Sequence, residues 1–447
     1  MTRRTFPDFV RKRVVYLLMV FFAPCTTLTA EDSTSTGIRV EQKTVLSPRL
    51  TEWKLTSPAL AFATSVRVLL PESMEEGKRY PVLYLLHGGA DDFRSWTVRG
   101  EAERLTAGLP LIVIMPDCGR AGWYTNWFNR GAGGSPEWET YHIGQLIRWV
   151  DDNFPTKATR DGRAIAGLSM GGFGALSYAA RHPDLFTAAA AYSGFVDIAD
   201  PKFAPRIVSL LPLLGTSANE VFGNYPEHVE RWRAHNPVDL AENLRGMTIV
   251  LRTGNGLVGP DHPYIDPIER SVHPTMVSMH GTLDRLGIDH TWEDYGPAGH
   301  SWKCWKRSLE KTLPQFMDAF EKQNPAPKSI SHVSAEPKCT VYGWCIARSH
   351  EGSKMIRLKD ASPNGFEVSG PGELTISTPP NTFRPHEVIN ARFQGDDNTQ
   401  HSTKLNADSV GSLLIPVKLD QGDAPSNSMV TIKVTFERVN GDSPNKH

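Results

Sequence analysis

The sequence has 447 residues, a formal net charge of −1, 40% hydrophobic residues and 22% charged residues. This length predicts two or three domains, and this composition excludes collagen-like, disulfide-scaffold and largely disordered chains. Because 48 Lys and Arg residues balance 49 Asp and Glu residues, no basic excess favours nucleic-acid binding. Only one apolar run is long enough to consider as a membrane segment, and it lies near the N-terminus.

The first 30 residues have the pattern of an export signal that is removed. Basic residues precede an apolar run over residues 14–23, Pro24 ends the run, and Leu28-Thr29-Ala30 is a small-residue cleavage site. We expect export by the Sec route, or by the twin-arginine route because of Arg3-Arg4; an uncleaved N-terminal anchor is the alternative. Cleavage after Ala30 leaves 43 basic and 48 acidic residues, a net charge of −5, with no stable membrane span.

Between about residues 45 and 323, short apolar runs alternate with stretches of helical spacing. The predicted strands are residues 65–70, 80–86, 111–115, 163–168, 186–193, 247–252 and 290–293. The predicted helices are residues 141–153, 172–181, 275–286 and 309–321. Strands that alternate with helices predict an α/β domain with a mostly parallel sheet covered on both faces.

The composition changes after residue 323. Residues 324–338 are rich in Pro, Ser and polar residues and predict a linker. Gly, Pro, Asn and Asp clusters then separate short β-like runs at residues 339–347, 373–377, 388–393, 412–419 and 430–436. This spacing predicts an all-β sandwich domain over residues 339–447.

Four cysteines remain after cleavage of the predicted signal: Cys118, Cys304, Cys339 and Cys345. An even number of cysteines in an exported chain is compatible with disulfides. We expect Cys339 and Cys345 to form a disulfide across a hairpin or loop, because they are close in sequence. Pairing of the other two depends on the fold.

The motif Gly-Leu-Ser-Met-Gly-Gly at residues 167–172 lies between a predicted strand and a predicted helix. This is the context of a nucleophile elbow, a sharp turn that exposes a serine hydroxyl at the end of a strand. The flanking glycines avoid Cβ clashes there, and the Met170 N–H points into the same space at a helix N-terminus. The motif therefore predicts Ser169 as a nucleophile; a Gly-rich turn with an ordinary serine is the alternative.

A serine nucleophile needs a base, and the chain offers fifteen histidines. In an α/β-hydrolase the chain order is serine, acid, histidine, with the histidine after the last strand. His300 fits this order because it follows the predicted strand 290–293 and precedes the last predicted helix. We expect His280 and His290 at the surface or in packing, and His262 in a turn.

The acid that orients the histidine should follow the predicted strand 247–252. Asp261, Asp266 and Glu269 compete for this role, and position alone does not decide among them.

A second oxyanion donor should come from the loop after the predicted strand 80–86. That loop, His-Gly-Gly-Ala at residues 87–90, is similar to the His-Gly-Gly motif of lipases and esterases. We expect the Gly89 and Met170 amides to form the oxyanion hole; an ordinary Gly-rich strand end is the alternative at Gly89.

Residues 47–320 resemble the esterase D family of α/β-hydrolases, and within it the antigen 85 mycolyltransferases most of all. The motif at residues 167–172 is shared with the wider family. Closer matches are residues 123–127, 138–140, 254–256 and 299–302. The resemblance implies an α/β-hydrolase fold with Ser169 as nucleophile, His300 as base and the Gly89 and Met170 amides as oxyanion hole. In the antigen 85 pattern an aspartate precedes the catalytic glutamate by eight positions, as Asp261 precedes Glu269. Glu269 is therefore the implied acid and Asp261 the alternative acid.

The chain departs from the antigen 85 pattern in the loop at residues 87–90. His87 stands where that family has a substrate-contacting aspartate, Ala90 where it has an arginine, and two residues are missing before Asp91. Mycolyl or trehalose specificity is therefore not implied. Near the C-terminus, residues 407–413 resemble the Asp-x-x-Gly turns of immunoglobulin-like modules, which implies an immunoglobulin-like sandwich.

Several side chains are candidates for substrate binding. We expect His87, Trp127 and Trp302 to contact the substrate. Two interpretations are open for a set of four tryptophans: they line a sugar or acyl site, or they pack in the core. The four are Trp96, Trp123, Trp127 and Trp138.

These patterns predict an exported serine carboxylic-ester hydrolase that acts through an acyl-enzyme on a small-molecule or carbohydrate ester. The alternatives are an acyltransferase to a sugar hydroxyl, a non-catalytic glycan-binding protein, and a thioesterase of the S-formylglutathione hydrolase type, which the export signal disfavours. The sequence has no Walker loop, no well-placed Gly-x-Gly-x-x-Gly and no Cys-x-x-Cys, so we expect no cofactor and no metal.

Overall fold

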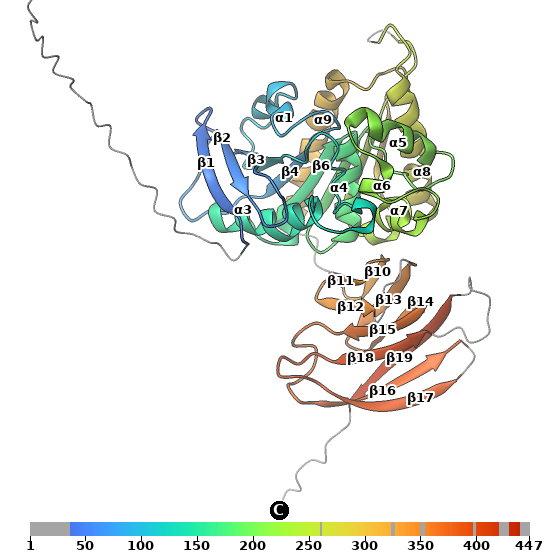
Figure 1. Cartoon of the computed structure of the whole chain (residues 1–447). Coiled ribbons are helices and arrows are strands. Elements are labelled where there is room, and N and C mark those ends of the chain that lie inside the picture. The colour runs from blue at the N-terminus through green and yellow to red at the C-terminus, as the bar shows by residue number, and fades with distance from the viewer. Residues whose placement is uncertain are drawn as a thin grey trace, which may run out of the picture.

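A computed structural model describes residues 36–259, 262–322, 327–348, 354–396, 399–419 and 429–438. These residues form two regions, an α/β region (residues 36–322) and a β region (residues 327–438), which lie one above the other in Figure 1. The predicted export signal at residues 1–30 is outside the described residues. Within the described ranges, no helix is both long enough and apolar enough to span a bilayer.

One nine-stranded sheet forms the middle of the α/β region, in the order β1-β2-β3-β5-β4-β6-β7-β8-β9. Its strands are β1 Arg39–Val45, β2 Leu50–Thr56, β3 Thr64–Leu69, β4 Val82–Leu86, β5 Ile112–Pro116, β6 Arg163–Leu168, β7 Ala188–Tyr192, β8 Thr248–Thr253 and β9 Thr291–Asp294. The six strands from β5 to β9 in this order are mutually parallel, and β3, β2 and β1 extend one edge antiparallel. The predicted mostly parallel sheet is therefore confirmed.

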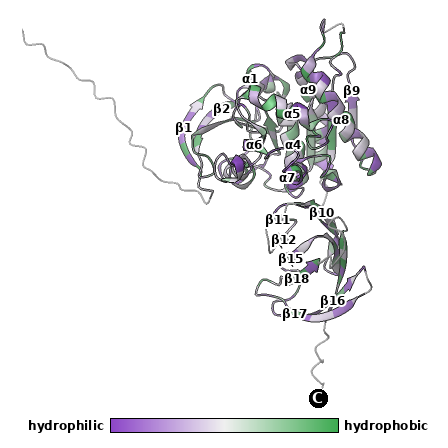
Figure 2. Cartoon of the chain, turned by 45° about the vertical axis from the view of Figure 1, so that its right-hand side comes forward, coloured by the Kyte–Doolittle hydropathy of each residue, from purple (hydrophilic) through white to green (hydrophobic). Residues whose placement is uncertain are grey.

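Helices cover both faces of this sheet. They are α1 Ser95–Val98, α2 Ala102–Leu105, α3 Ile147–Asn153, α4 Met170–Arg181, α5 Ala204–Leu210, α6 Ala218–Val221, α7 Val229–His235, α8 Pro267–Arg285 and α9 Trp302–Lys322. Shorter helical segments are η1 Asn129–Gly131, η2 Thr140–Leu146, η3 Arg160–Gly162, η4 Leu211–Leu214 and η5 Ala241–Leu244. One hydrophobic cluster joins α3, α4 and α8 to the sheet, and a second joins α1, α2 and α9 to its other face. Figure 2 shows apolar residues (green) on the central strands and hydrophilic residues (purple) on the outer helices.

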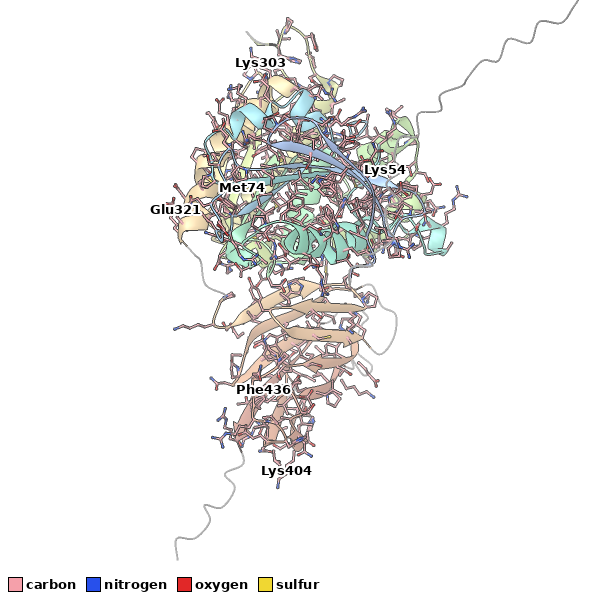
Figure 3. The ribbon with its side chains drawn as sticks, turned by 90° about the vertical axis from the view of Figure 1, so that its left-hand side faces the viewer. Lys54, Met74, Lys303, Glu321, Lys404 and Phe436 are labelled. Atoms are coloured by element: carbon pink, nitrogen blue, oxygen red, sulfur yellow. The ribbon has the colours of Figure 1, made fainter. Side chains whose placement is uncertain are left out.

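Helix α9 shows why a sequence stripe forms one of these layers. Trp305, Leu309 and Phe316 recur at helical spacing and are all buried in the second cluster. Lys303 and Glu321, labelled in Figure 3, lie near the two ends of the helix, which runs from the far end of the α/β region toward the β region.

The α/β region starts before the predicted boundary at residue 45, because β1 begins at Arg39 and pairs with β2. Strand β1 is an edge strand whose residues are mostly exposed and polar, so it lacks the apolar alternation that predicts a strand. Three helices between residues 204 and 235 were also not predicted, because they are only four to seven residues long.

The β region consists of two antiparallel sheets. Their strands are β10 Ile330–Ser334, β11 Lys338–Val341, β12 Trp344–Arg348, β13 Ile356–Ser362, β14 Gly365–Gly370, β15 Gly372–Ser377, β16 Val388–Gly395, β17 Gln400–Asn406, β18 Leu414–Leu419 and β19 Val430–Arg438. The sheet orders are β10-β13-β14-β19-β16-β17 and β11-β12-β15-β18. One hydrophobic cluster contains side chains from both sheets, so the region is a β sandwich. That it is immunoglobulin-like stays a prediction.

Strand β10 lies inside the predicted linker 324–338, so the β region begins earlier than the predicted residue 339. The short run Ile-Ser-His-Val-Ser has few apolar residues, and Pro and Ser around it gave the segment the composition of a linker.

The expected Cys339–Cys345 disulfide is wrong in this structure, where Cys118, Cys304, Cys339 and Cys345 are all free. In the β11–β12 hairpin Cys339 pairs with Ile346, and Thr340 pairs with Cys345. Because directly paired residues share a face and neighbours along a strand alternate, the two thiols point to opposite faces of the sheet.

The two regions contact each other at the C-terminal end of α4. Asn243 of η5 accepts a hydrogen bond from the Val333 amide (2.7 Å) and donates one to the Val333 carbonyl (2.8 Å). Arg181, the last residue of α4, forms a 2.9 Å ion pair with Glu336. The 12-residue helix is roughly 18 Å long, so this contact lies one helix length from the residue before α4, Ser169.

Candidate active site

Ser169 occupies a sharp turn between β6 and α4, as predicted. Its backbone has φ 53° and ψ −119°, a conformation that residues other than glycine rarely adopt. Two glycines make this turn sterically possible. A Cβ on Gly167 would lie 2.2 Å from the Gly171 carbonyl oxygen, and a Cβ on Gly171 would lie 2.5 Å from the His87 carbonyl oxygen. The turn therefore needs glycine at both positions and places Ser169 at the carboxyl end of the parallel strands.

His300 and Glu269 form a close pair. The Nδ1 atom of His300 lies 2.6 Å from Oε2 of Glu269, whose side chain is fully buried. His300 follows β9 and Glu269 lies in the first turn of α8, so both residues lie at the same edge of the sheet as Ser169. The His300 and Trp305 rings also pack edge-to-face, with centroids 4.9 Å apart. Of the three acids that the sequence left open, Glu269 is the one that contacts the histidine ring.

The other oxygen of the Glu269 carboxylate accepts three hydrogen bonds. Their donors are the hydroxyls of Ser193 and Thr253 and the amide of Gly254, each at 2.8 Å. These donors compensate the burial of the carboxylate and fix its orientation. Ser193 also follows Tyr192, whose carbonyl accepts a 2.9 Å hydrogen bond from the Ser169 amide. A short series of contacts thus joins the serine turn to the Glu269–His300 pair.

Asp266 holds the main chain of the site instead of the histidine ring. It is the N-cap of α8, accepting hydrogen bonds from the Ile268 and Glu269 amides, and its second oxygen accepts one from the His300 amide at 2.8 Å. Burial alone would raise the pKa of Asp266, but these amides and the nearby His300 outweigh it and lower the pKa. The Asp-Pro pair that opens α8 is the sequence signal for this cap. Asp261, the alternative acid, lies outside the described residues.

The loop after β4 brings the Gly88–Gly89 peptide next to Ser169. A Cβ on Gly88 would lie 3.4 Å from the Ser169 Cβ. Within the described part of the chain, the Gly89 and Met170 amides have no hydrogen-bond acceptor. Gly88, whose carbonyl shares a peptide unit with the Gly89 amide, thus lies beside the serine, and the oxyanion role of the Gly89 and Met170 amides stays a prediction.

His87 is fully buried, and both of its ring nitrogens contact the main chain. The Cys118 amide donates to Nε2 at 2.9 Å, so the ring proton must be on Nδ1, which lies 2.8 Å from the Gly88 carbonyl oxygen. That carbonyl belongs to the same peptide unit as the Gly89 N–H. His87 thus orients the Gly89 amide, a contact that the sequence motif alone did not predict. A direct contact of His87 with substrate stays a prediction.

The candidate tryptophans differ in burial. Trp96, Trp123 and Trp138 are buried in the hydrophobic clusters, which confirms the core alternative for them. Trp302 is half-buried and packs edge-to-face on Trp96 at 5.2 Å, close to His300 in sequence. Trp127 is also half-buried, and its indole N–H donates to the Gly122 carbonyl. Substrate contact by either residue stays a prediction.

Comparison with known proteins gives consistent results. The model of the esterase family matches residues 57–316. Esterase Rv1288 of Mycobacterium tuberculosis (strain H37Rv) is 36% identical over 277 residues, which cover 59% of this chain and 58% of that protein. The diacylglycerol acyltransferase/mycolyltransferase Ag85B of Mycobacterium leprae is 27% identical over 280 residues, 60% of this chain and 83% of that protein. Among solved structures, Mycobacterium tuberculosis MPT51 covers 59% of this chain and 96% of its own, with 23% identity and a TM-score of 0.51.

The match to Rv1288 spans less than two thirds of that protein, and the likeness to MPT51 concerns the fold. The family model, however, covers more than half of this chain and includes the serine turn, Glu269 and His300. This protein therefore belongs to the esterase family, and its α/β region has the α/β-hydrolase fold.

Proposed function

We propose that the protein is a serine esterase that works through an acyl-enzyme on Ser169. The observation that supports this most strongly is the 2.6 Å contact between the buried Glu269 carboxylate and the His300 ring. This pair stands at the same sheet edge as the strained Ser169 turn, in an esterase-family chain. Glu269 holds Nδ1–H of the imidazole, so that Nε2 is the basic nitrogen.

The proposed reaction uses these groups in the following order. As the Ser169 Oγ attacks the ester carbonyl, His300 Nε2 takes the hydroxyl proton. The Gly89 and Met170 amides donate to the oxygen that becomes negative in the tetrahedral intermediate. Collapse of the intermediate expels the alcohol, which takes the proton from His300 and leaves an acyl-enzyme. A water molecule, deprotonated by His300, then attacks the acyl carbon, and the acid leaves as Ser169 regains its proton.

Ser169→Ala tests this proposal directly. We expect p-nitrophenyl acetate hydrolysis to fall by at least about 10³-fold, because removing a triad nucleophile leaves only binding and oxyanion stabilisation. A fluorophosphonate probe should label the wild-type chain and not the variant. Ser209→Ala, on an exposed position of α5, is the matched control and should behave like wild type. Retained hydrolysis in Ser169→Ala would contradict the assignment, and absence of probe labelling in the wild type would favour a non-catalytic glycan-binding role.

A second proposal concerns the acceptor. The Ag85B relative is named as an acyltransferase, and transfer to a sugar hydroxyl uses the same acyl-enzyme with a different second nucleophile. Product analysis with and without trehalose or another glycan distinguishes the two. An acylated sugar would support transfer; free acid as the sole product in every case would exclude it. A panel of small-molecule, lipid and acetylated or feruloylated carbohydrate esters then identifies the acyl group.

We also propose that the protein is exported, on the basis of the sequence pattern at residues 1–30. N-terminal sequencing of the protein from the extracytoplasmic fraction should begin at Glu31. Recovery of the intact N-terminus in the cytoplasm would contradict this.

A further inference from the structure

Three side chains with metal-ligating atoms meet at the end of α8 that is far from Glu269. His280 and Asp284 lie one helical turn apart on α8, and His290 directly precedes β9. One ligand atom from each of the three lies within 4.8 Å of the others. Helix α8 and strand β9 lie side by side at one edge of the molecule (Figure 2). None of the three residues has a part in the proposed reaction.

His290 presents a fixed lone pair to this cluster. Its side chain is only 4% exposed, and its Nδ1 lies 2.8 Å from the Ile288 carbonyl oxygen. A carbonyl only accepts, so Nδ1 has the ring proton and Nε2 is unprotonated in the neutral imidazole. Metal-bound histidines are usually oriented in this way, by a hydrogen bond from the other ring nitrogen to a carbonyl or carboxylate.

His280 and Asp284 complete the set from the helix. Nδ1 of His280 lies 2.8 Å from Nε2 of His290, and the His280 ring stacks on Trp292 with centroids 4.8 Å apart and planes 6° apart. One carboxylate oxygen of Asp284 is 4.0 Å from Nε2 of His290, and the other is 3.5 Å from Nε2 of His280. The Asp284 side chain is 61% exposed, so an ion can enter from solvent.

We propose that His280, Asp284 and His290 bind a divalent transition metal, with Zn²⁺ as the best match. Two imidazoles and one carboxylate are ligands that Zn²⁺ takes readily, whereas Ca²⁺ and Mg²⁺ prefer all-oxygen sites. Nδ1 of His280, Nε2 of His290 and the Asp284 oxygen that lies 4.0 Å from Nε2 of His290 are the ligands, and water takes the open position. The proton now between the two rings moves to Nε2 of His280, whose side chain is 29% exposed, so that Nε2–H donates a hydrogen bond to solvent.

The site ties the end of α8 to the start of β9. Glu269 is eleven residues away on the same helix, roughly 16 Å along its axis, so the ion does not reach the reacting atoms. The ion therefore acts on stability, because a metal that binds the folded chain but not the unfolded chain raises the free energy of unfolding. The sequence did not predict this site, because the two histidines stand ten residues apart and become neighbours only when β9 pairs beside α8.

Zinc titration of the chelator-treated full chain, in competition with a chromogenic chelator, tests the proposal. We expect one Zn²⁺ per chain, and at least about tenfold weaker binding in His280→Gln and in Asp284→Asn. His273→Gln is the matched control: it lies on the same helix and hydrogen-bonds Asp294 instead of the cluster. It should bind Zn²⁺ like wild type.

Two further readouts keep the test decisive. Zn²⁺ should raise the Tm of wild type and His273→Gln, but not that of the two cluster variants, whose Tm without metal reports their folding. Co²⁺ should give ligand-field bands without a thiolate charge-transfer band, since no cysteine is in the cluster. No binding, equal affinity in all four proteins, or a thiolate band would overturn the proposal. None of these measurements depends on ester turnover, so they succeed or fail separately from the proposed esterase activity.

Discussion

The α/β region and the β region bury different kinds of side chain. The α/β region buries charged and polar groups such as Glu269, Glu139 and His87, each with several partners. In the described part of the β region, the buried polar side chains are His332, Ser334 and Thr378, and the first two lie on β10, which contacts η5 of the α/β region. Burying a polar group without hydrogen-bond partners costs free energy. We therefore expect buried polar groups where they have a structural or functional role. The buried polar groups are thus concentrated in the α/β region, and two of the three in the described part of the β region lie on the strand that contacts it.

Glu269→Gln, in the α/β region, is the change with the largest expected effect on activity. The neutral amide no longer fixes the Nδ1–H tautomer or stabilises the charged imidazole, so we expect kcat/KM to fall by about 10⁴-fold. Steady-state hydrolysis of p-nitrophenyl acetate measures this, with circular dichroism as the check on folding. A loss smaller than about tenfold would mean that another carboxylate orients His300, and Asp261→Asn would then be the variant to compare.

Arg181→Met removes an ion pair at the contact between the two regions. Arg181 pairs with the buried Glu139 and with Glu336 of the β region. Burial alone would raise the pKa of Glu139, but Arg181 and His182 outweigh it and hold the pKa well below its ordinary value. Removing the guanidinium leaves a buried carboxylate without its main partner, so we expect the free energy of unfolding to fall by about 3–5 kcal/mol.

Urea denaturation measures the effect of Arg181→Met. Arg233→Met is the control, because Arg233 forms comparable ion pairs with Glu230 and Asp239 but is 44% exposed. We expect the control to lose less than about 1 kcal/mol. Equal losses in the two variants would contradict the role of burial.

The sequence predicted the turn and the pairing of the candidate site better than the edges of the fold. The serine turn and His300 were predictable because sharp turns need glycine and because chain order restricts the histidine. Strand β1 and β10 were missed because edge strands and short polar strands have little apolar periodicity. The contacts of Ser193 and Thr253 with Glu269 depend on three separate strand or helix ends meeting in space, which no local pattern encodes. The cysteine pairing failed because hairpin register, not sequence distance, decides which face a thiol takes.

The pH dependence of stability distinguishes the polar contact from the apolar core of the β region. Burial, with help from the positive Arg181 and the nearby His182, lowers the pKa of His332 to about 3. The unfolded chain takes up this proton below about pH 6.5 and the folded chain does not, so stability falls by about 1.4 kcal/mol per pH unit as the pH drops from about 6.5 toward 3. His332→Gln should flatten the fall between pH 6.5 and 4.5. An unchanged slope would show that His332 is protonated in the folded state.

His87 tests whether a buried residue acts on the reaction without touching substrate. In His87→Ala the Gly88–Gly89 peptide loses its hydrogen bond, so the oxyanion donor is less well oriented and kcat should fall by about 10- to 100-fold, with a smaller change in KM. His87→Asn places an amide N–H near the former Nδ1 and should restore most of kcat. If KM rises and kcat is unchanged in both variants, His87 contacts substrate as the motif comparison implied.

Glu336→Gln is expected to have the smallest effect. It tests whether the contact between the two regions affects kcat. Glu336 is 32% exposed, so its ion pair with Arg181 is partly screened, and Arg181 keeps Glu139 as a partner. We expect the free energy of unfolding to fall by about 1 kcal/mol. Because the contact stands roughly 18 Å along α4 from Ser169, kcat should change by less than about twofold. A larger change in kcat, without loss of folded protein, would mean that α4 transmits the state of the β region to the serine turn at its other end. The contrast between a chemical region and a supporting region would then have to be replaced by one cooperative unit.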